Sequence, residues 1–238
     1  IEDPGLRDLF RDVEFDLVNL HAAQIDVRIS VADPARDASV NVIGLLNVLE
    51  GAREVGTRRV VYVSSGGVVY GEPEQLPTPE VAPKLPLSPY GVAKLSGEHY
   101  LHYYREVHGL EYVVLRYANV FGPRQDSRGE AGVVAIFCDR LMVGEELTIF
   151  GDGEQTRDYV YVKDIAEANY LALTRDAPSL IGRHLNVGTG IECSLLELHS
   201  LIAEELDFRR GFTLGPPRVG DARRSCSDVS LLTSALGF

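Results

Sequence analysis

The chain has 238 residues, of which 45% are hydrophobic and 24% are charged, and its formal net charge is −12. This composition is typical of a globular protein that buries a large core in one or two domains. The negative charge excludes a general affinity for nucleic acids or acidic membranes, and no apolar run approaches the ~20 residues that cross a bilayer. The three scattered cysteines lack metal-ligand spacing and indicate free thiols in a cytoplasmic protein, and no metal site is implied.

Strand-like and helix-like stretches alternate along the first half of the chain. This alternation predicts an α/β fold in which helices cover both faces of a parallel sheet. Apolar side chains at Val42, Leu45, Leu46 and Leu49 have the spacing of an amphipathic helix. The elements predicted here are a strand at 15–20, a helix at 37–54, a strand at 59–64, a proline-rich loop at 72–87, a helix at 89–108 and a strand at 111–120.

Beyond residue 122 the alternation weakens, which predicts a smaller mixed region. Ser194 and Glu197 form a capping box that begins a helix. The elements predicted in this part are a helix at 133–143, a strand at 147–150, a turn at 151–156, a helix at 164–174, a strand at 184–187 and a helix at 195–206. We expect one domain over residues 1–124 and a second over 125–238, with about 157–190 returning to the first.

Tyr90 and Lys94 form the most informative pair in the sequence. A spacing of four residues places them on one face of a helix, one turn apart. A tyrosine hydroxyl, with a pKa near 10, is a poor base, but a cation one turn away favours the phenolate. The pair could therefore serve as a general base and its activator. Taken alone, it is also compatible with an exposed Tyr and Lys on an amphipathic helix.

The surroundings of the pair favour the catalytic interpretation. The preceding strand ends in a Ser/Gly-rich segment, and the chain contains the strings SSGGVVYGE, SPYGVAK and LRYANVFGPRQ. Together they resemble the extended short-chain dehydrogenase/reductases, within them the NAD-dependent epimerase/dehydratase family, and the UDP-glucose 4-epimerases in particular. The resemblance implies a Rossmann-like sheet with a smaller substrate-binding domain, NAD as the cofactor and a UDP-hexose as the substrate. It also implies C4 epimerisation and a homodimer formed by the helices near Asn41 and Tyr90.

The resemblance assigns roles to matching positions. Tyr90 is the expected general base, Lys94 its activator, and Ser65 a possible participant. The positions expected to bind the cofactor are Ala22, Ala23, Gln24, Asn41, Ser64, Tyr90, Lys94 and Tyr117. The positions expected to bind the nucleotide-sugar are Asn119, Thr148, Phe150, Arg157, Arg218, Asp221 and Ser225.

Three positions differ from relatives in ways that bear on the reaction. Gly66 stands where the family usually has a Ser or Thr, so Ser65 or a water molecule must orient the sugar hydroxyl, or the site is weaker. Gly67 and Val68 replace the carboxyl pair of 4,6-dehydratases, which favours epimerisation over loss of water. The small Ser225 leaves room for an N-acetyl group on the sugar, so UDP-GlcNAc or UDP-GalNAc is an alternative substrate.

A G-x-x-G-x-x-G turn for the cofactor pyrophosphate does not occur in the 238 residues. We therefore expect that the sequence is part of a longer protein in which a βαβ unit precedes it, and that NAD binds this part weakly. Two other interpretations stay open: a nucleotide-sugar dehydratase or decarboxylase, and a non-catalytic scaffold or cofactor sensor.

Overall fold

A four-stranded parallel sheet forms the centre of the molecule. The computed structural model describes residues 1–128, 132–217 and 222–238. The strands of this sheet, in spatial order, are β1 (Leu17–Leu20), β2 (Arg59–Ser65), β3 (Glu111–Tyr117) and β7 (Arg183–Val187). Ser65 pairs with Tyr117, and Tyr117 pairs with Val187, so the three longer strands end together at one edge. The prediction of a parallel sheet is confirmed, and in parallel sheets the carboxyl edge is where ligands usually bind.

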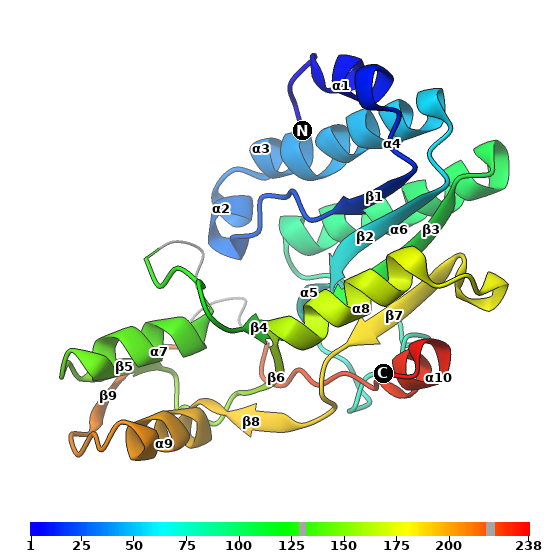
Figure 1. The fold of residues 1–238 in the computed structure, drawn as a ribbon. Coiled ribbons are helices and arrows are strands. Elements are labelled where there is room, and N and C mark those ends of the chain that lie inside the picture. The colour runs from blue at the N-terminus through cyan, green and yellow to red at the C-terminus, as the bar shows by residue number, and fades with distance from the viewer. Residues whose placement is uncertain (129–131, 218–221) are drawn as a thin grey trace.

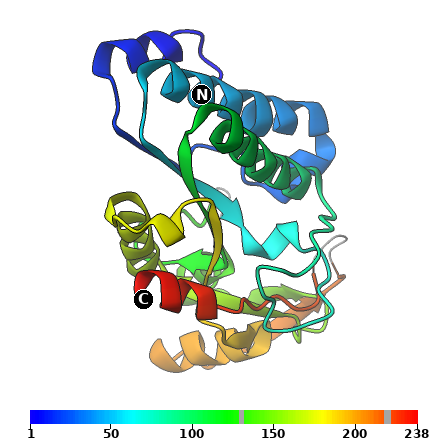
Figure 2. The ribbon, with the colours of Figure 1, turned by 90° about the vertical axis from the view of Figure 1, so that its right-hand side faces the viewer.

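Helices cover both faces of this sheet, as the alternation predicts (Figure 2). On one face, α4 (Gly44–Val55) and α6 (Pro89–His108) enclose a core that includes Leu45, Leu49 and Leu101. On the other, α8 (Val162–Thr174) packs on β2 and β3, and α10 (Ser230–Leu236) packs on β7 and α8. Because both faces are buried, the strands have nearly continuous apolar sequences.

The predicted helix at 37–54 is three consecutive segments in the structure. These are α3 (Pro34–Ala38), a π-helical stretch (Ser39–Ile43) and α4. The Asp33 side chain caps α3, because its Oδ1 accepts a hydrogen bond of 2.9 Å from the Arg36 amide. Single π turns occur often at functional sites, and this one carries Asn41.

A second group of elements lies beyond the carboxyl ends of the main strands (Figure 1). The predicted strand at 111–120 is interrupted at Ala118, and β4 (Asn119–Phe121) pairs with β6 instead of continuing in the main sheet. The elements of this group are β4, β6 (Thr156–Tyr161), β8 (Glu192–Ser194), β5 (Leu147–Phe150), β9 (Phe212–Gly215), α7 (Val133–Met142) and α9 (Leu195–Glu205). Phe137, Ile149 and Leu198 contribute to their separate core.

Several short elements were not predicted from the sequence. Their apolar residues are few and acquire partners only through tertiary contacts, as in the three-residue strand β8. They are α1 (Leu6–Val13), α2 (Val27–Ala32), α5 (Gly66–Val69), a 3₁₀ turn (Pro178–Leu180), β6, β8, β9 and α10. The capping box is confirmed, since the Ser194 hydroxyl accepts a hydrogen bond of 3.1 Å from the Glu197 amide. Within the described ranges, none of the helices has the length and apolarity that crossing a bilayer requires.

Candidate active site

Tyr90 and Lys94 lie in the first turns of α6, beside the carboxyl ends of the main strands. Ser88 caps this helix by accepting a hydrogen bond of 3.1 Å from the Gly91 amide, and Pro89 occupies the first position. A Cβ atom on Gly91 would lie 2.9 Å from the Val68 carbonyl oxygen, so glycine allows α6 to approach α5, the short helix after β2, closely. The expected helix at 89–108 is therefore confirmed, and it presents the pair beside the end of the sheet.

The Lys94 amine is buried among aromatic rings. Its Nζ donates a hydrogen bond of 2.8 Å to the Val63 carbonyl and lies 5.0 Å from the Tyr62 ring centroid and 5.8 Å from that of Tyr90. Burial lowers the pKa of Lys94 to about 8, although the negative charges of Asp37 and Glu98 oppose this shift. The amine is therefore largely charged at neutral pH and close enough to Tyr90 to stabilise a phenolate.

A buried ion pair fixes α6 against the sheet. Glu98 follows Lys94 by one turn, and both of its oxygens accept hydrogen bonds from Arg116 of β3, at 3.0 and 2.6 Å. The Ser64 hydroxyl donates to Glu98 at 2.7 Å. Burial alone would raise the pKa of Glu98, but the hydrogen bonds and charge of Arg116 outweigh it and hold the pKa below its usual range. Ser64, expected to bind the cofactor, has its hydroxyl directed to this pair.

The loop after β1 is held to the π-helical turn by amide side chains. The Gln24 amide donates to Asn41 Oδ1 at 3.0 Å, and Asn41 Nδ2 donates to the Gln24 carbonyl at 2.9 Å. The carboxylate of Asp37 accepts from both side-chain amides, at 2.8 Å from Gln24 and 2.9 Å from Asn41. Ala22 is exposed and Ala23 half-buried in the same loop. The structure thus brings Gln24 and Asn41 together, and the expected roles of Ala22 and Ala23 stay predictions.

Tyr117 lies at the end of β3 and contacts two side chains from other elements. Asn169 of α8 donates a hydrogen bond of 2.5 Å to its hydroxyl. The His21 ring lies 6.2 Å from the Tyr117 ring centroid and is 3.2 Å from Asn169 Oδ1. Burial raises the pKa of Tyr117, so its hydroxyl stays protonated at neutral pH. Asn169, which sequence reasoning missed, connects α8 to the expected cofactor side.

The small residues after β2 lie beside the C-terminal segment. A Cβ on Gly67 would lie 3.9 Å from the Ser65 hydroxyl oxygen and 4.0 Å from that of Ser225. Asp158 of β6 holds this segment, since its carboxylate accepts hydrogen bonds from the amides of Thr189, Gly190 and Ser227, at 2.8, 3.1 and 3.3 Å. Ser65 and Ser225, separated by 160 positions in sequence, therefore lie close together.

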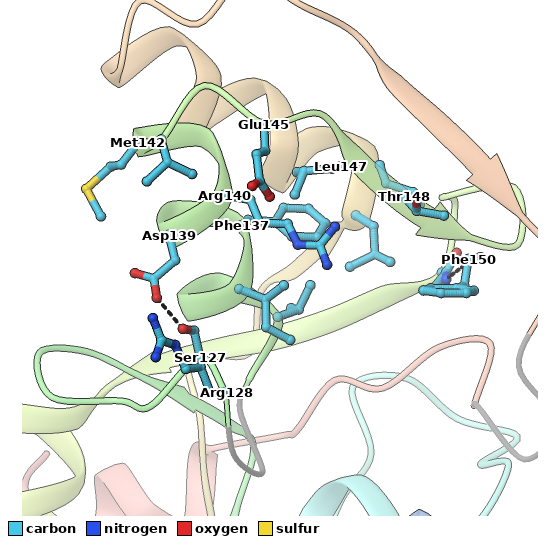
Figure 3. A pocket seen from close by; sticks show the side chains of 16 residues that line it. Ser127, Arg128, Phe137, Asp139, Arg140, Met142, Glu145, Leu147, Thr148 and Phe150 are labelled. Atoms are coloured by element: carbon cyan, nitrogen blue, oxygen red, sulfur yellow. Dashed lines mark hydrogen bonds between the residues drawn. The ribbon is translucent and has the colours of Figure 1, made fainter.

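A cavity of about 730 Å³ lies between α7 and β5 (Figure 3). Thr148 and Phe150, both expected to bind the nucleotide, line it from β5. The Gln155 side chain donates a hydrogen bond of 2.7 Å to the Phe150 carbonyl and fixes the turn that follows β5. Other lining residues include Ser127, Phe137, Arg140, Glu145 and Leu147. Mostly apolar walls with a few polar groups are typical of small-molecule sites.

The remaining expected substrate positions lie on neighbouring strands or outside the described part. Asn119 of β4 pairs with Tyr159 of β6. Arg157 is the second residue of the same strand, and its Nη1 donates a hydrogen bond of 2.7 Å to the Thr156 carbonyl. The Thr156 carbonyl also accepts from the Ser225 amide at 3.2 Å, so Arg157 lies near the segment of Ser225. Arg218 and Asp221 lie outside the described residues, and their expected roles stay predictions.

Sequence reasoning missed the buried groups behind the pair. Asp37, Tyr62, Glu98 and Arg116 are all less than 4% exposed, and most of their partners lie far away in sequence. The sequence signals were local: Glu98 follows Lys94, and Asn41 follows Asp37, at the spacing of one helical turn.

Comparison with known proteins identifies the family. Residues 2–188 match the NAD dependent epimerase/dehydratase family. The chain is 45% identical over 238 residues to a UDP-glucose 4-epimerase of Mycolicibacterium smegmatis, covering 100% of this chain and 75% of that protein.

Two solved structures agree with this result. The UDP-glucose 4-epimerase of Thermotoga maritima, solved with UDP-glucose, superposes with a TM-score of 0.94 at 44% identity, covering 98% of this chain and 75% of that one. That of Thermus thermophilus, solved with NAD, gives 0.91 at 41% identity, covering 98% and 76%. With the fold and the Tyr90–Lys94 geometry, these similarities show that the chain belongs to the NAD-dependent epimerase/dehydratase family and is similar to its UDP-glucose 4-epimerases.

Proposed function

We propose that this chain catalyses the C4 epimerisation of a UDP-hexose, with UDP-glucose and UDP-galactose as the two partners of the equilibrium. The observation that carries the proposal is the geometry of Tyr90 and Lys94 on α6. The buried amine lies 5.8 Å from the Tyr90 ring centroid and stays largely charged at neutral pH. Tyr90 then takes the proton from the C4 hydroxyl of the sugar and returns it after the sugar has rotated in the site.

The residues of this chain suit one end of an NAD molecule. The Lys94 ammonium has three hydrogens, and within the described residues the Val63 carbonyl is its one hydrogen-bond acceptor, so donors are left for a ligand. When bound, NAD supplies the hydride acceptor for the sugar C4 carbon. We propose that Ala22, Ala23, Gln24 and Asn41 line the cofactor side of the site. Tyr117 would limit the space beside the cofactor, since the Tyr117 hydroxyl is held by Asn169.

We propose that residues 125–238 bind the UDP group while residues 1–124 bind the cofactor. Thr148 and Phe150 would contact the base in the cavity of Figure 3, where an aromatic ring and strand edge suit a flat pyrimidine. Arg157 would pair with the diphosphate, since guanidinium groups bind phosphate oxygens bidentately. Asn119, Arg218 and Asp221 are proposed for the same group on the grounds of their sequence positions.

Dehydration and decarboxylation are less well supported than epimerisation. Elimination of water from the sugar needs a carboxyl acid and base beside Tyr90. Gly67 and Val68, two and three residues after Ser65, occupy the positions where such carboxyls would stand. Among the described residues, the groups within 4 Å of a Cβ on Gly67 are the Ser65 and Ser225 hydroxyls. This arrangement offers Tyr90 and hydroxyl groups, which suffice for moving one proton on and off O4.

The test is product analysis with UDP-galactose and added NAD. Because the sequence contains no G-x-x-G-x-x-G turn, we would assay the chain alone and also fused behind the Gly-rich βαβ unit of a relative. We expect UDP-glucose of unchanged mass from the fusion and much slower turnover from the chain alone. A product lighter by water or carbon dioxide would support a dehydratase or decarboxylase, and no turnover by either protein would refute the epimerase proposal.

We predict that Ser225 allows a large substituent at C2 of the sugar. The side chain is small and lies near Gly67 and Ser65, so UDP-GlcNAc should be accepted beside UDP-glucose. Ser225→Tyr should reduce kcat/KM for UDP-GlcNAc relative to UDP-glucose by about 10–200-fold, because the new ring fills the space of the acetyl group. Ser225→Ala is the control. An equal loss for both substrates in Ser225→Tyr would place Ser225 away from C2.

We also propose a homodimer that packs α6 against its symmetry mate. Val92, Tyr100, Tyr103 and Val107 lie within one 80° sector of α6, and they are 37–59% exposed. Ile43, on the π-helical turn that packs against α6, is a further exposed apolar residue, at 54%. Light scattering should give twice the chain mass, and Tyr103→Lys with Val107→Lys should give the monomer mass, with Glu106→Lys as the control. A monomeric wild type would contradict the proposal.

A further inference from the structure

Lys94 and Asp37 are two buried charges that lack ion-pair partners among the described residues. Asp37 is 1% exposed and Lys94 is 3% exposed. Within the described residues, neither makes an ion pair shorter than 4.0 Å: the Asp37 carboxylate accepts hydrogen bonds from the neutral amides of Gln24 and Asn41, and Lys94 donates to a carbonyl. Buried charges persist when an opposite charge compensates them, so these two should stabilise each other.

The carboxylate of Asp37 has one oxygen available for this purpose. Both neutral amides donate to Oδ1, while Oδ2 is buried without a hydrogen-bond partner in the described part of the chain. Glu98, the other carboxylate near Lys94, is already compensated by the bidentate Arg116. The negative charge of Asp37 is thus the one that its own hydrogen bonds leave uncompensated.

Tyr62 provides the surface on which the ammonium rests. Its ring centroid lies 5.0 Å from Lys94 Nζ, within the range of a cation–π interaction. Its hydroxyl is also buried without a hydrogen-bond partner among the described residues. A Cβ on Gly97 would lie 2.5 Å from that hydroxyl oxygen, so glycine at this position allows the ring to lie directly beneath α6.

We propose that Asp37 and Tyr62 are positioning residues that keep the Lys94 amine protonated and close to Tyr90, Asp37 as its counter-charge and Tyr62 as an aromatic support. This role deepens the proposed function, because it matters for catalysis only if Lys94 activates Tyr90. The ring centroids of Tyr62 and Tyr90 lie 5.0 and 5.8 Å from Lys94 Nζ. The charged and titratable groups that also act on the amine are Asp37 of α3, which packs on α6, Glu98 one turn along α6, and His21 in the loop after β1. His21 does not add a second cation at neutral pH, because desolvation and the charge of Lys94 both lower its pKa.

The lysine content of the chain permits a direct measurement. The sequence contains three lysines, Lys84, Lys94 and Lys163, so ¹³C-lysine labelling gives a spectrum in which each side chain can be assigned by replacing the other two with arginine. Titration of the Cε signals reports the pKa of the Lys94 amine without any assay of activity. We expect the pKa of Lys94 in the wild type at about 8.

The variants separate charge from shape. Asp37→Asn preserves the hydrogen bonds at Oδ1 and removes the charge, so the pKa of Lys94 should fall by about 1 unit or more. Tyr62→Leu should also lower it, by about half a unit or more, whereas Tyr62→Phe, which retains the ring, should leave it unchanged. Asp12→Asn, on the exposed face of α1, is the control for a change of net charge.

Two outcomes would overturn the inference. The first is a Lys94 titration in Asp37→Asn and Tyr62→Leu that matches the Asp12→Asn control. The second is a Lys94 pKa that is the same in Tyr62→Leu and Tyr62→Phe. This comparison can be made even if Asp37→Asn does not fold. Chemical shifts of Lys84 and Lys163 show in each case whether the variant is folded.

A pH–rate profile of the NAD-loaded fusion then tests the link to catalysis. In Asp37→Asn the alkaline decline of kcat should move to lower pH, because the amine loses its proton earlier. A Lys94 titration that shifts while the rate profile does not would support the positioning role and contradict the proposed role of Lys94 in the reaction. The failures of the inference and of the proposed function are therefore distinguishable.

Discussion

Replacing Tyr90 with phenylalanine should reduce kcat for UDP-galactose epimerisation by about 10²–10⁴-fold, the usual contribution of a positioned general base. Phenylalanine retains the buried ring of Tyr90, a residue that is 8% exposed, and removes only the hydroxyl. The loss should therefore appear in kcat, with little change in KM or in the temperature of unfolding. The measurement is steady-state kinetics of the fusion protein, together with a thermal melt of each variant.

Tyr170→Phe is the control, because it removes a hydroxyl from a tyrosine of α8 that is 64% exposed and lies outside the proposed dimer surface. That variant should have wild-type kcat. A Tyr90→Phe enzyme with kcat within tenfold of the wild type would contradict the assignment of Tyr90 as the base. In that case a different group of the site would have to accept the proton of the C4 hydroxyl.

Replacing Glu98 with glutamine should cost about 3–5 kcal/mol of unfolding free energy, as expected when one member of a buried ion pair is removed. The side chains of Glu98 and Arg116 are both 3% exposed, so the variant leaves a guanidinium charge buried opposite a neutral amide. Urea unfolding at pH 7 measures the loss. Arg116→Met together with Glu98→Gln should be less destabilised than the sum of the single variants, because no unpaired charge is left.

The loss of unfolding free energy in Glu98→Gln should depend on pH. The folded-state pKa of Glu98 is held below the ordinary value of 4.5, so its ionised form stabilises the fold above that pH. As pH falls below 4.5 through the folded-state pKa, the wild type loses this contribution. The difference in unfolding free energy between the wild type and Glu98→Gln should therefore become smaller. Glu192→Gln, which breaks the exposed pair with Arg224, is the control and should have a much smaller effect at pH 7. A difference between wild type and Glu98→Gln that stays constant from pH 7 to pH 3 would contradict the account.

Local patterns were sufficient for the main sheet and for the helix of the Tyr–Lys pair. The helix predicted at 89–108 begins at Pro89 and ends at His108, because Ser88, Pro89 and the following Gly109 are strong local signals. The strand at 147–150 is likewise confirmed. In contrast, residues 151–156 were predicted as a turn and nothing was predicted for 157–161, but Thr156 begins β6, which exists by pairing with β4 and β8. A strand of mixed polarity has no periodic signal until its partners are known.

For the site, too, some features could be predicted from local sequence and others depended on tertiary contacts. Sequence was enough to identify the Tyr90–Lys94 spacing and the small residues after β2, because each depends on neighbours a few positions away. The fold was needed to show that the Tyr62 ring lies beneath the Lys94 amine, that Asp37 is buried, and that Ser225 lies beside Gly67. The physical reason is that burial and the absence of a competing partner determine how strongly a charge acts, and both depend on segments distant in sequence.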